Sequence, residues 1–160
     1  MIKMIKSIKV LGLATAIFFT GCASTVSPEV MKKEIATYKL PKQSEKGKAL
    51  VYTVRPSAVG GLVKFNMHVD DKTAESEMGY TRGSEYIYFN LTPGTHTLYS
   101  DAENWADLTV TVKAGDVIFV EQIAQMGILF ARNTLKSLES FKGKYHVKNL
   151  TLGTILKQDR

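Results

Sequence analysis

From Lys48 onward, hydrophobic and polar residues alternate with the period of two that β-strands require. Clusters of Pro, Gly and Asp, which are typical of turns, separate the alternating runs. The pattern predicts strands near residues 49–55, 63–69, 85–91, 96–100, 108–112 and 117–124, and residues 128–131 extend the sheet. About seven short strands before any helix predict a mostly β fold, an antiparallel β-sandwich or small barrel.

Beyond Asn133 the pattern is ambiguous. Leu135 and Leu138 are three residues apart, and Val147 and Leu150 repeat this spacing. The spacing predicts one or two short C-terminal helices that pack across the sheet.

The N-terminus follows a third pattern. Lys3, Lys6 and Lys9 precede an apolar run at residues 10–19. This run is shorter than the roughly 20 apolar residues of a transmembrane helix, but it has the length of the apolar region of a signal peptide. Small residues then lead to Cys22, the single cysteine of the chain.

The tetrapeptide FTGC at residues 19–22 resembles the lipobox of bacterial lipoproteins, with Phe19 in place of the usual Leu, Val or Ile. The resemblance implies that the signal peptide, residues 1–21, is removed and that Cys22 carries acyl chains, its lipid attachment to a membrane. Ala23, rather than Asp, implies the periplasmic face of the outer membrane. A secretory signal with a buried Cys22 is the alternative.

Residues 22–47 form the predicted lipidated N-terminus and tether, and residues 48–160 the folded domain. Ser, Thr, Lys, Glu and Pro dominate the tether, which favours a flexible linker. A helix is the alternative, because Ser27 suits an N-cap and Pro28 the first turn. One face of that helix would carry Met31, Ile35 and Tyr38.

Composition limits the classes of function. The hydrophobic and charged fractions, 44% and 22%, are those of an ordinary globular domain. The formal charge of +6 includes the three lysines of the signal peptide, and residues 22–160 contain 18 Lys and Arg against 15 Asp and Glu. This weak excess predicts no nucleic-acid partner.

Three short motifs between residues 48 and 152 resemble a bacterial domain of unknown function found on small lipoproteins. They are ALVYTVR at residues 49–55, PGTH at residues 93–96 and AGDVIFV at residues 114–120. The Pro-Gly hairpin is also similar to those of PEGA and transthyretin-like sandwiches. These resemblances imply a fold and bring no activity with them.

Few reactive side chains converge in the pattern. His68 and Asp70 share a strand face that we expect to be exposed to solvent, and they lack a third metal ligand. We expect His96 to stabilise the Pro-Gly hairpin through a hydrogen bond. The polar residues around Trp105 lack the spacing of a calcium loop; they are Asp101, Glu103, Asn104 and Asp107. We therefore expect no enzyme activity, no bound metal and no cofactor.

These observations favour a lipid-anchored cell-envelope protein whose sandwich is a non-catalytic binding module. Its expected partners are the membrane, through the acyl chains on Cys22, and an envelope protein or peptidoglycan. The alternative is a structural accessory subunit of an envelope assembly.

A tyrosine patch is the candidate interaction face. If residues 92–95 join two paired strands, Tyr86, Tyr88 and Tyr99 share the outer face of the sheet. The opposite face then forms the core, with Ile87, Phe89, Leu91 and Leu98. The alternative is that the C-terminal segment covers the tyrosines.

Overall fold

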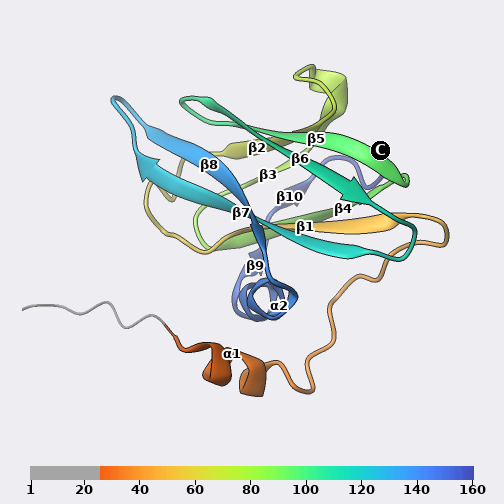
Figure 1. The fold of residues 1–160 in the computed structure, drawn as a ribbon. Helices are drawn as coiled ribbons and strands as arrows, with labels where there is room; N and C mark the ends of the chain where they lie inside the picture. The colour runs from red at the N-terminus through yellow and green to blue at the C-terminus, as the bar shows by residue number, and fades with distance from the viewer. Residues whose placement is uncertain (1–25) are drawn as a thin grey trace, which may run out of the picture.

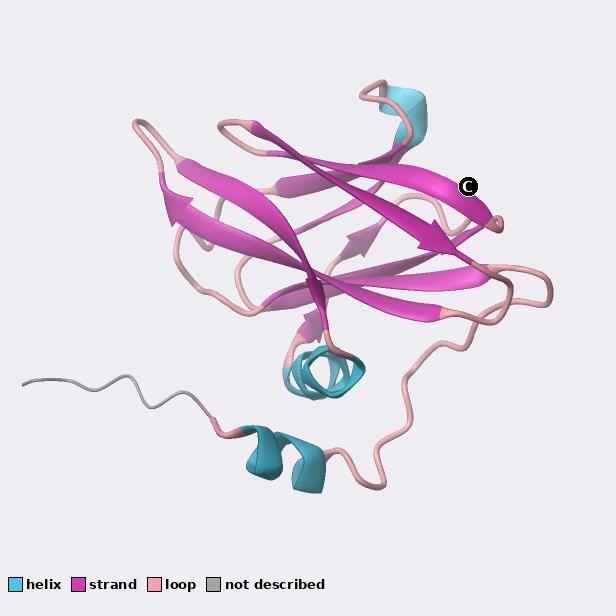
Figure 2. Cartoon of the chain, in the orientation of Figure 1, coloured by secondary structure: helices cyan, strands magenta, loops and turns pink. Residues whose placement is uncertain are grey.

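Residues 26–160 are described by a computed structural model, in which two five-stranded sheets pack face to face (Figures 1 and 2). This arrangement confirms the predicted mostly β fold and is a sandwich rather than a barrel. The predicted signal peptide and Cys22 lie outside the described residues.

The first sheet has β1 at its centre, antiparallel to β4 and parallel to β7. Its strands, in spatial order, are β8 (Ala131–Leu138), β7 (Val117–Met126), β1 (Ala49–Arg55), β4 (Glu85–Leu91) and β9 (Thr151–Leu152). The second sheet is antiparallel throughout. Its order is β10 (Thr154–Ile155), β3 (Glu77–Thr81), β2 (Phe65–Val69), β5 (Gly94–Asp101) and β6 (Trp105–Val112).

Between the sheets lies a core to which both contribute alternate residues. Val51 and Phe89 from the first sheet meet Met67 and Leu98 from the second, and all four are inaccessible to solvent. The core includes the four residues predicted for it, Ile87, Phe89, Leu91 and Leu98.

A second apolar cluster covers the outer face of the first sheet. The alternate residues of β1, such as Leu50 and Tyr52, point there, and Val147 of α2 (Ser140–Asn149) packs onto them. Because both faces of β1 are covered, every residue of the strand is buried. Tyr38 and Leu40 extend the same cluster.

The tether contains the helix that was the alternative to a flexible linker. α1 (Pro28–Glu34) begins at Ser27, whose hydroxyl accepts the Val30 N–H at 3.4 Å. α1 packs beside α2 (Figure 1), and Lys148 of α2 donates to the Glu34 carbonyl at 2.8 Å. Neither α1 nor α2 is long and apolar enough to cross a membrane, and the same holds for the short 3-10 turn η1 (Ala74–Ser76).

The predicted pairing across residues 92–95 is wrong. β4 pairs with β1 in the first sheet, whereas β5 pairs with β2 and β6 in the second. The chain crosses between the sheets at Thr92 and Pro93. Pro93 has no N–H for a strand ladder, which suits a corner better than a continuing hairpin. The core assignment survives because both strands still face inward.

Further elements differ from the sequence prediction. β3 was not predicted, since its five residues, EMGYT, contain a central glycine and only two hydrophobic residues. The two-residue strands β9 and β10 were not predicted either. The helix predicted from the spacing of Leu135 and Leu138 is wrong, because residues 131–138 form β8 against β7. Only the later segment, residues 140–149, is helical.

Candidate functional site

Two loops at one end of the sandwich expose large hydrophobic side chains. They are residues 57–63, between β1 and β2, and residues 126–130, at the tip of the β7–β8 hairpin; we call them together the apolar end. Neither loop contains a charged residue. Its exposed hydrophobic residues are Val59 (51%), Leu62 (92%), Met126 (87%), Ile128 (87%), Leu129 (80%) and Phe130 (65%).

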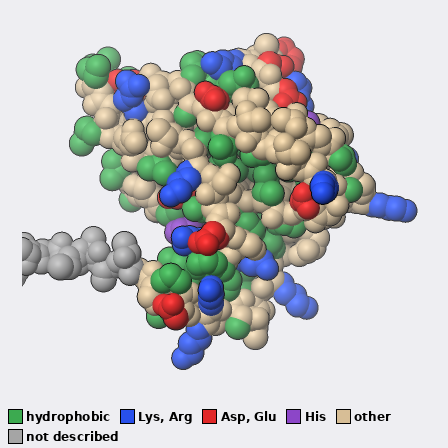
Figure 3. All heavy atoms as spheres, viewed as in Figure 1, with side chains coloured by type: hydrophobic (Ala, Val, Ile, Leu, Met, Phe, Trp, Pro, Cys, Tyr) green, Lys and Arg blue, Asp and Glu red, His purple; other side chains and the backbone are tan. Residues whose placement is uncertain are grey.

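Figure 3 shows hydrophobic side chains gathered at the upper left of the molecule, where Figure 1 places the β7–β8 hairpin. Single exposed hydrophobic residues are common on soluble proteins, but a contiguous group marks a contact surface. A groove of about 260 Å³ separates the two loops and is mostly apolar. Its lining includes Val59, Val63, Met126, Leu129 and Phe130.

Buried Arg55 holds the first loop in place. Its guanidinium donates to the carbonyls of Val63, Val59 and Gly60 at 2.6, 2.9 and 2.8 Å. Its planar group also lies 3.5 Å from the ring centroid of Phe65. Burial lowers the pKa of Arg55 from its usual value, and the three carbonyl oxygens compensate part of the lost hydration.

Glu103 holds the second loop. Its carboxylate accepts the backbone N–H groups of Ile128, Leu129 and Phe130 at 2.9, 3.2 and 2.8 Å. These hydrogen bonds hold the pKa of Glu103 below its usual value. The backbone donors of the tip are thus satisfied from within the protein, while the side chains stay exposed.

The two loops touch at their bases. Gly60 has a φ of +59°, and a Cβ atom on it would lie 2.5 Å from the Cβ of Ala131. A side chain at position 60 would therefore be strained and would push the loops apart. The neighbouring turn supports the first loop as well, since Gly83 donates to the Gly61 carbonyl at 3.1 Å.

Positive side chains surround the apolar end. Lys64 follows the first loop directly and is exposed, and Arg132, also exposed, lies two residues after the second loop. Arg82 is partly exposed and precedes Gly83, which contacts the first loop. The site therefore combines an uncharged apolar centre with a rim that carries three positive side chains and the carboxylate of Glu103.

A buried polar cluster ties the two sheets together beneath this end. Gln122 of β7 accepts the Thr81 hydroxyl at 2.6 Å and donates to the Ser100 hydroxyl at 2.8 Å. Asn104, in the β5–β6 turn, accepts the Asn133 N–H at 2.8 Å. These bonds join both sheets and give the loops a rigid base.

The predicted tyrosine patch is divided between two surfaces. Tyr86 and Tyr88 lie on the outer face of the first sheet, beside Tyr52, whereas Tyr99 belongs to the second sheet. Tyr86 is only 8% exposed. The C-terminal helix and residues 38–40 cover this face, as the alternative expected. The three tyrosines do not form one contact surface.

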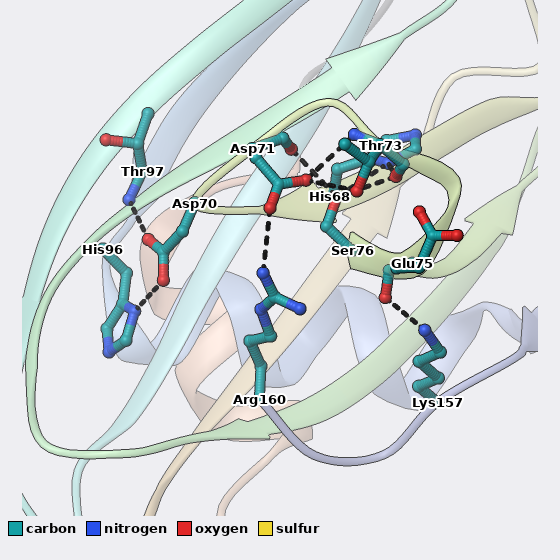
Figure 4. A network of polar contacts seen from close by, with 10 residues as sticks. All are labelled: His68, Asp70, Asp71, Thr73, Glu75, Ser76, His96, Thr97, Lys157 and Arg160. Carbon is teal, nitrogen blue, oxygen red and sulfur yellow. Dashed lines mark hydrogen bonds and ion pairs between the residues drawn. The ribbon is translucent and has the colours of Figure 1, made fainter.

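The candidate polar residues stabilise a surface loop (Figure 4). The expectation that His68 faces solvent is wrong: it is buried, its Nδ1 lies 2.9 Å from the Thr73 carbonyl, and its ring lies beside Trp105. Asp70, with a φ of 67°, turns away from His68 and contacts His96 Nδ1 at 2.8 Å.

His96 makes the predicted hydrogen bond across the Pro-Gly turn, although the turn joins the two sheets and is not a hairpin. Its Nε2 lies 2.9 Å from the Thr92 carbonyl, across the Pro-Gly turn. In the same network the C-terminal Arg160 contacts Asp71 at 3.0 Å (Figure 4). Hydrogen bonds from Thr73 and Ser76, with the charge of Arg160, hold the pKa of Asp71 well below its usual range.

Residues 26–160 contain no group of three or more His, Cys, Asp or Glu arranged to hold a metal ion. The polar residues around Trp105 do not converge, because Glu103 and Asn104 turn toward the β7–β8 hairpin. A larger cavity, about 360 Å³, opens between β6 and β7–β8. Its lining offers hydroxyl groups, such as those of Thr109, Thr111 and Ser137, and no titratable side chain.

Comparison with known proteins shows the family. A family model described as "Protein of unknown function (DUF2846)" matches residues 45–134, more than half of the chain. The chain belongs to the DUF2846 family. The matched DUF2846 region includes all three motifs that resemble a domain of unknown function, and it includes both loops of the apolar end.

An uncharacterized protein from Haemophilus influenzae is similar to this chain. It is 23% identical over 141 residues, which are 88% of this chain and 80% of the relative. The likeness therefore extends beyond the part matched to DUF2846, and it carries no function with it.

Sequence reasoning missed the residues that make the apolar end. Residues 128–131 were interpreted as a strand extension, and Glu103 was considered only as one of the polar residues around Trp105 that lack the spacing of a calcium loop. One signal was present: the run QMGILFA at residues 125–131 follows an apolar strand, contains a glycine and has no charge. A hydrophobic turn of this kind predicts an exposed contact.

Proposed function

We propose that this DUF2846 protein is a lipid-anchored cell-envelope protein, held by acyl chains on Cys22 at the periplasmic face of the outer membrane. Its sandwich serves as a non-catalytic binding module, and the apolar end is its contact surface. One observation carries the proposal: six large hydrophobic side chains are exposed together on two loops whose backbones are fixed from inside the protein.

The polar residues support a role in binding rather than in catalysis. His68 and His96 both use their ring nitrogens for hydrogen bonds that hold turns. Arg55 and Glu103 bind backbone groups of the apolar end. These four side chains are thus engaged in shaping loops and turns.

The anchor is tested by labelling cells with a radioactive fatty acid. The wild-type protein is expected to take up label and Cys22→Ser to take up none. Label retained in the Cys22→Ser protein contradicts the anchor.

The contact surface is tested by comparing membranes that contain wild-type protein with membranes that contain Ile128→Ser/Leu129→Ser/Phe130→Ser. When a chemical cross-linker is added, the wild-type protein should form a cross-linked product, or the membrane should shield it from the reagent. The triple variant should show neither result. Ala114→Ser, in the turn before β7, is the control and should behave as wild type. A complex of fixed stoichiometry that survives the triple substitution would favour the accessory-subunit alternative.

A further inference from the structure

We propose that the apolar end seats on the surface of the lipid bilayer, so that the loops at residues 57–63 and 126–130 insert their side chains among the lipids. The inference deepens the proposed function, and its geometry rests on the proposed anchor at Cys22. The sandwich would then have two contacts with one membrane, the acyl chains and the apolar end.

The first support is the hydrogen bonding of the loop backbones. A backbone N–H or C=O that enters hydrocarbon without a partner loses its hydration and gains nothing in return. Glu103 binds the N–H groups of Ile128, Leu129 and Phe130, and Gly127 donates to the Phe130 carbonyl at 3.0 Å. The internal pairing therefore removes one cost of moving this loop from water into hydrocarbon.

The same holds for the first loop. Arg55 donates to the carbonyls of Val59, Gly60 and Val63, and Val63 donates to the Gly60 carbonyl at 2.9 Å. Both loops therefore expose apolar side chains while much of their backbone polarity is satisfied internally. This combination suits an apolar phase.

The second support is the distribution of charge. The loops carry no charged residue. Lys64, Arg82 and Arg132 beside them are positive, and the one carboxylate in contact with them, that of Glu103, is held in hydrogen bonds to the loop backbone. Apolar side chains beside Lys and Arg are typical of proteins that lie in the membrane interface, because the cations meet anionic head groups while the apolar groups enter the acyl boundary.

The third support is the position of the anchor. Five peptide steps separate Cys22 from Ser27, and a fully extended chain spans at most about 3.6 Å per residue. α1 therefore begins within about 18 Å of the acylated residue. In Figure 1, α1 starts on the left of the molecule, the side on which the β7–β8 hairpin and the loop after β1 also lie. One plane on that side can meet the anchor and both loops.

The test uses the full-length protein, purified in detergent and reconstituted into vesicles of phosphatidylcholine and phosphatidylglycerol that contain brominated lipid. Bromine quenches tryptophan fluorescence on contact. Phe130→Trp places the probe at the apolar end. Ala114→Trp, the matched control, places it in the exposed turn at the opposite end of β7. Both carry Trp105→Phe, which removes the natural tryptophan.

We expect quenching at position 130 to be several-fold stronger than at position 114. Replacing Lys64, Arg82 and Arg132 with Gln should reduce it in vesicles that contain phosphatidylglycerol. Equal quenching at the two positions, or none at position 130, overturns the inference. If quenching is absent and a cross-linker at position 128 captures a protein, the apolar end binds that protein and not the bilayer.

Intact mass spectrometry of the same sample reports whether Cys22 is acylated. Quenching at position 130 in an unacylated chain supports the bilayer contact and contradicts the anchor. An acylated chain with no quenching contradicts the bilayer contact and leaves the anchor standing. A thermal melt of each tryptophan variant confirms that it remains folded, as expected for substitutions at exposed positions.

Discussion

Glu103 replaces the water that would otherwise solvate three backbone amides at the tip of the β7–β8 hairpin. Its carboxylate, in the β5–β6 turn, reaches a loop 25 residues further along the chain. Arg55 has the complementary task, since it supplies donors to carbonyl groups of the other loop. At the scale of single residues, the anionic Glu103 and the cationic Arg55 hold the backbones of the two loops.

Glu103→Gln is expected to loosen the β7–β8 tip, because a neutral amide has one acceptor oxygen where the carboxylate has two. The amides of Ile128, Leu129 and Phe130 should exchange with deuterium faster than in the wild type. Glu75→Gln is the control, since Glu75 is exposed and contacts Lys157 through its backbone carbonyl. Unchanged exchange in Glu103→Gln would contradict the role of the carboxylate.

The same contact has a defined pH dependence. Folding lowers the pKa of Glu103, so the stability it contributes is fully present above the unfolded pKa and is lost as the pH falls through the folded pKa. The protection factor of the tip amides, which is the intrinsic exchange rate at a given pH divided by the observed rate, should therefore fall in acid in the wild type. In Glu103→Gln this fall should be smaller, and an equal fall would exclude Glu103 as its source.

Gly60 offers a test of the contact between the loops. Alanine at position 60 has to adopt a left-handed backbone, which costs about 1–2 kcal/mol, and its methyl group meets Ala131, which adds about 1–3 kcal/mol of overpacking. Gly115→Ala is the matched control, because Gly115 has a φ of +88° with nothing within 4 Å. Denaturant unfolding should show the larger loss for Gly60→Ala, and equal losses would contradict the close approach.

At the scale of elements, most strands could be predicted from the sequence because alternation and turn residues are local signals. β1, β4 and β7 lie within a residue or two of their predicted positions. The partner of each strand could not be predicted in the same way. A Pro-Gly turn is compatible with both a hairpin and a crossing between sheets, and the choice depends on β1 and β2, which are distant in sequence.

The separation of β4 from β5 gives Tyr86 and Tyr99 different surroundings. Tyr86→Ser removes a buried ring and should cost about 3–5 kcal/mol. Tyr99→Ser affects a partly exposed ring of the second sheet and should cost less than about 1 kcal/mol. Denaturant unfolding of each variant measures the difference. Similar losses would contradict the division of the tyrosines between two sheets.

The packing of the tether on the first sheet is also a contact between elements. The Tyr52 hydroxyl donates to the Lys42 carbonyl and accepts the Lys42 N–H, both at 2.9 Å, and Tyr38 and Leu40 pack nearby. We expect residues 48–160 to fold alone into a β-rich domain that melts cooperatively but is about 2–3 kcal/mol less stable than residues 26–160. Circular dichroism of the two fragments tests this. A disordered 48–160 fragment would show that the fold requires the tether.

At the scale of the whole molecule, the predicted lipid anchor and the apolar end differ in how far the sequence predicts them. The predicted lipid anchor depends on a contiguous motif, so it could be predicted from the sequence. The apolar end depends on two loops about 65 residues apart in sequence, and on Arg55 and Glu103, whose partners are backbone groups. Residue patterns record side chains and not backbone partners, so this surface required the structure.

Met126 is a natural reporter of whether the apolar end is the contact surface. Met126 is 87% exposed, and peroxide converts an accessible methionine to its sulfoxide. In intact membranes Met126 should oxidise several-fold more slowly than in purified, detergent-free protein. An added methionine, Ala114→Met, should oxidise equally fast in both. Equal rates for Met126 in the two preparations would contradict the claim.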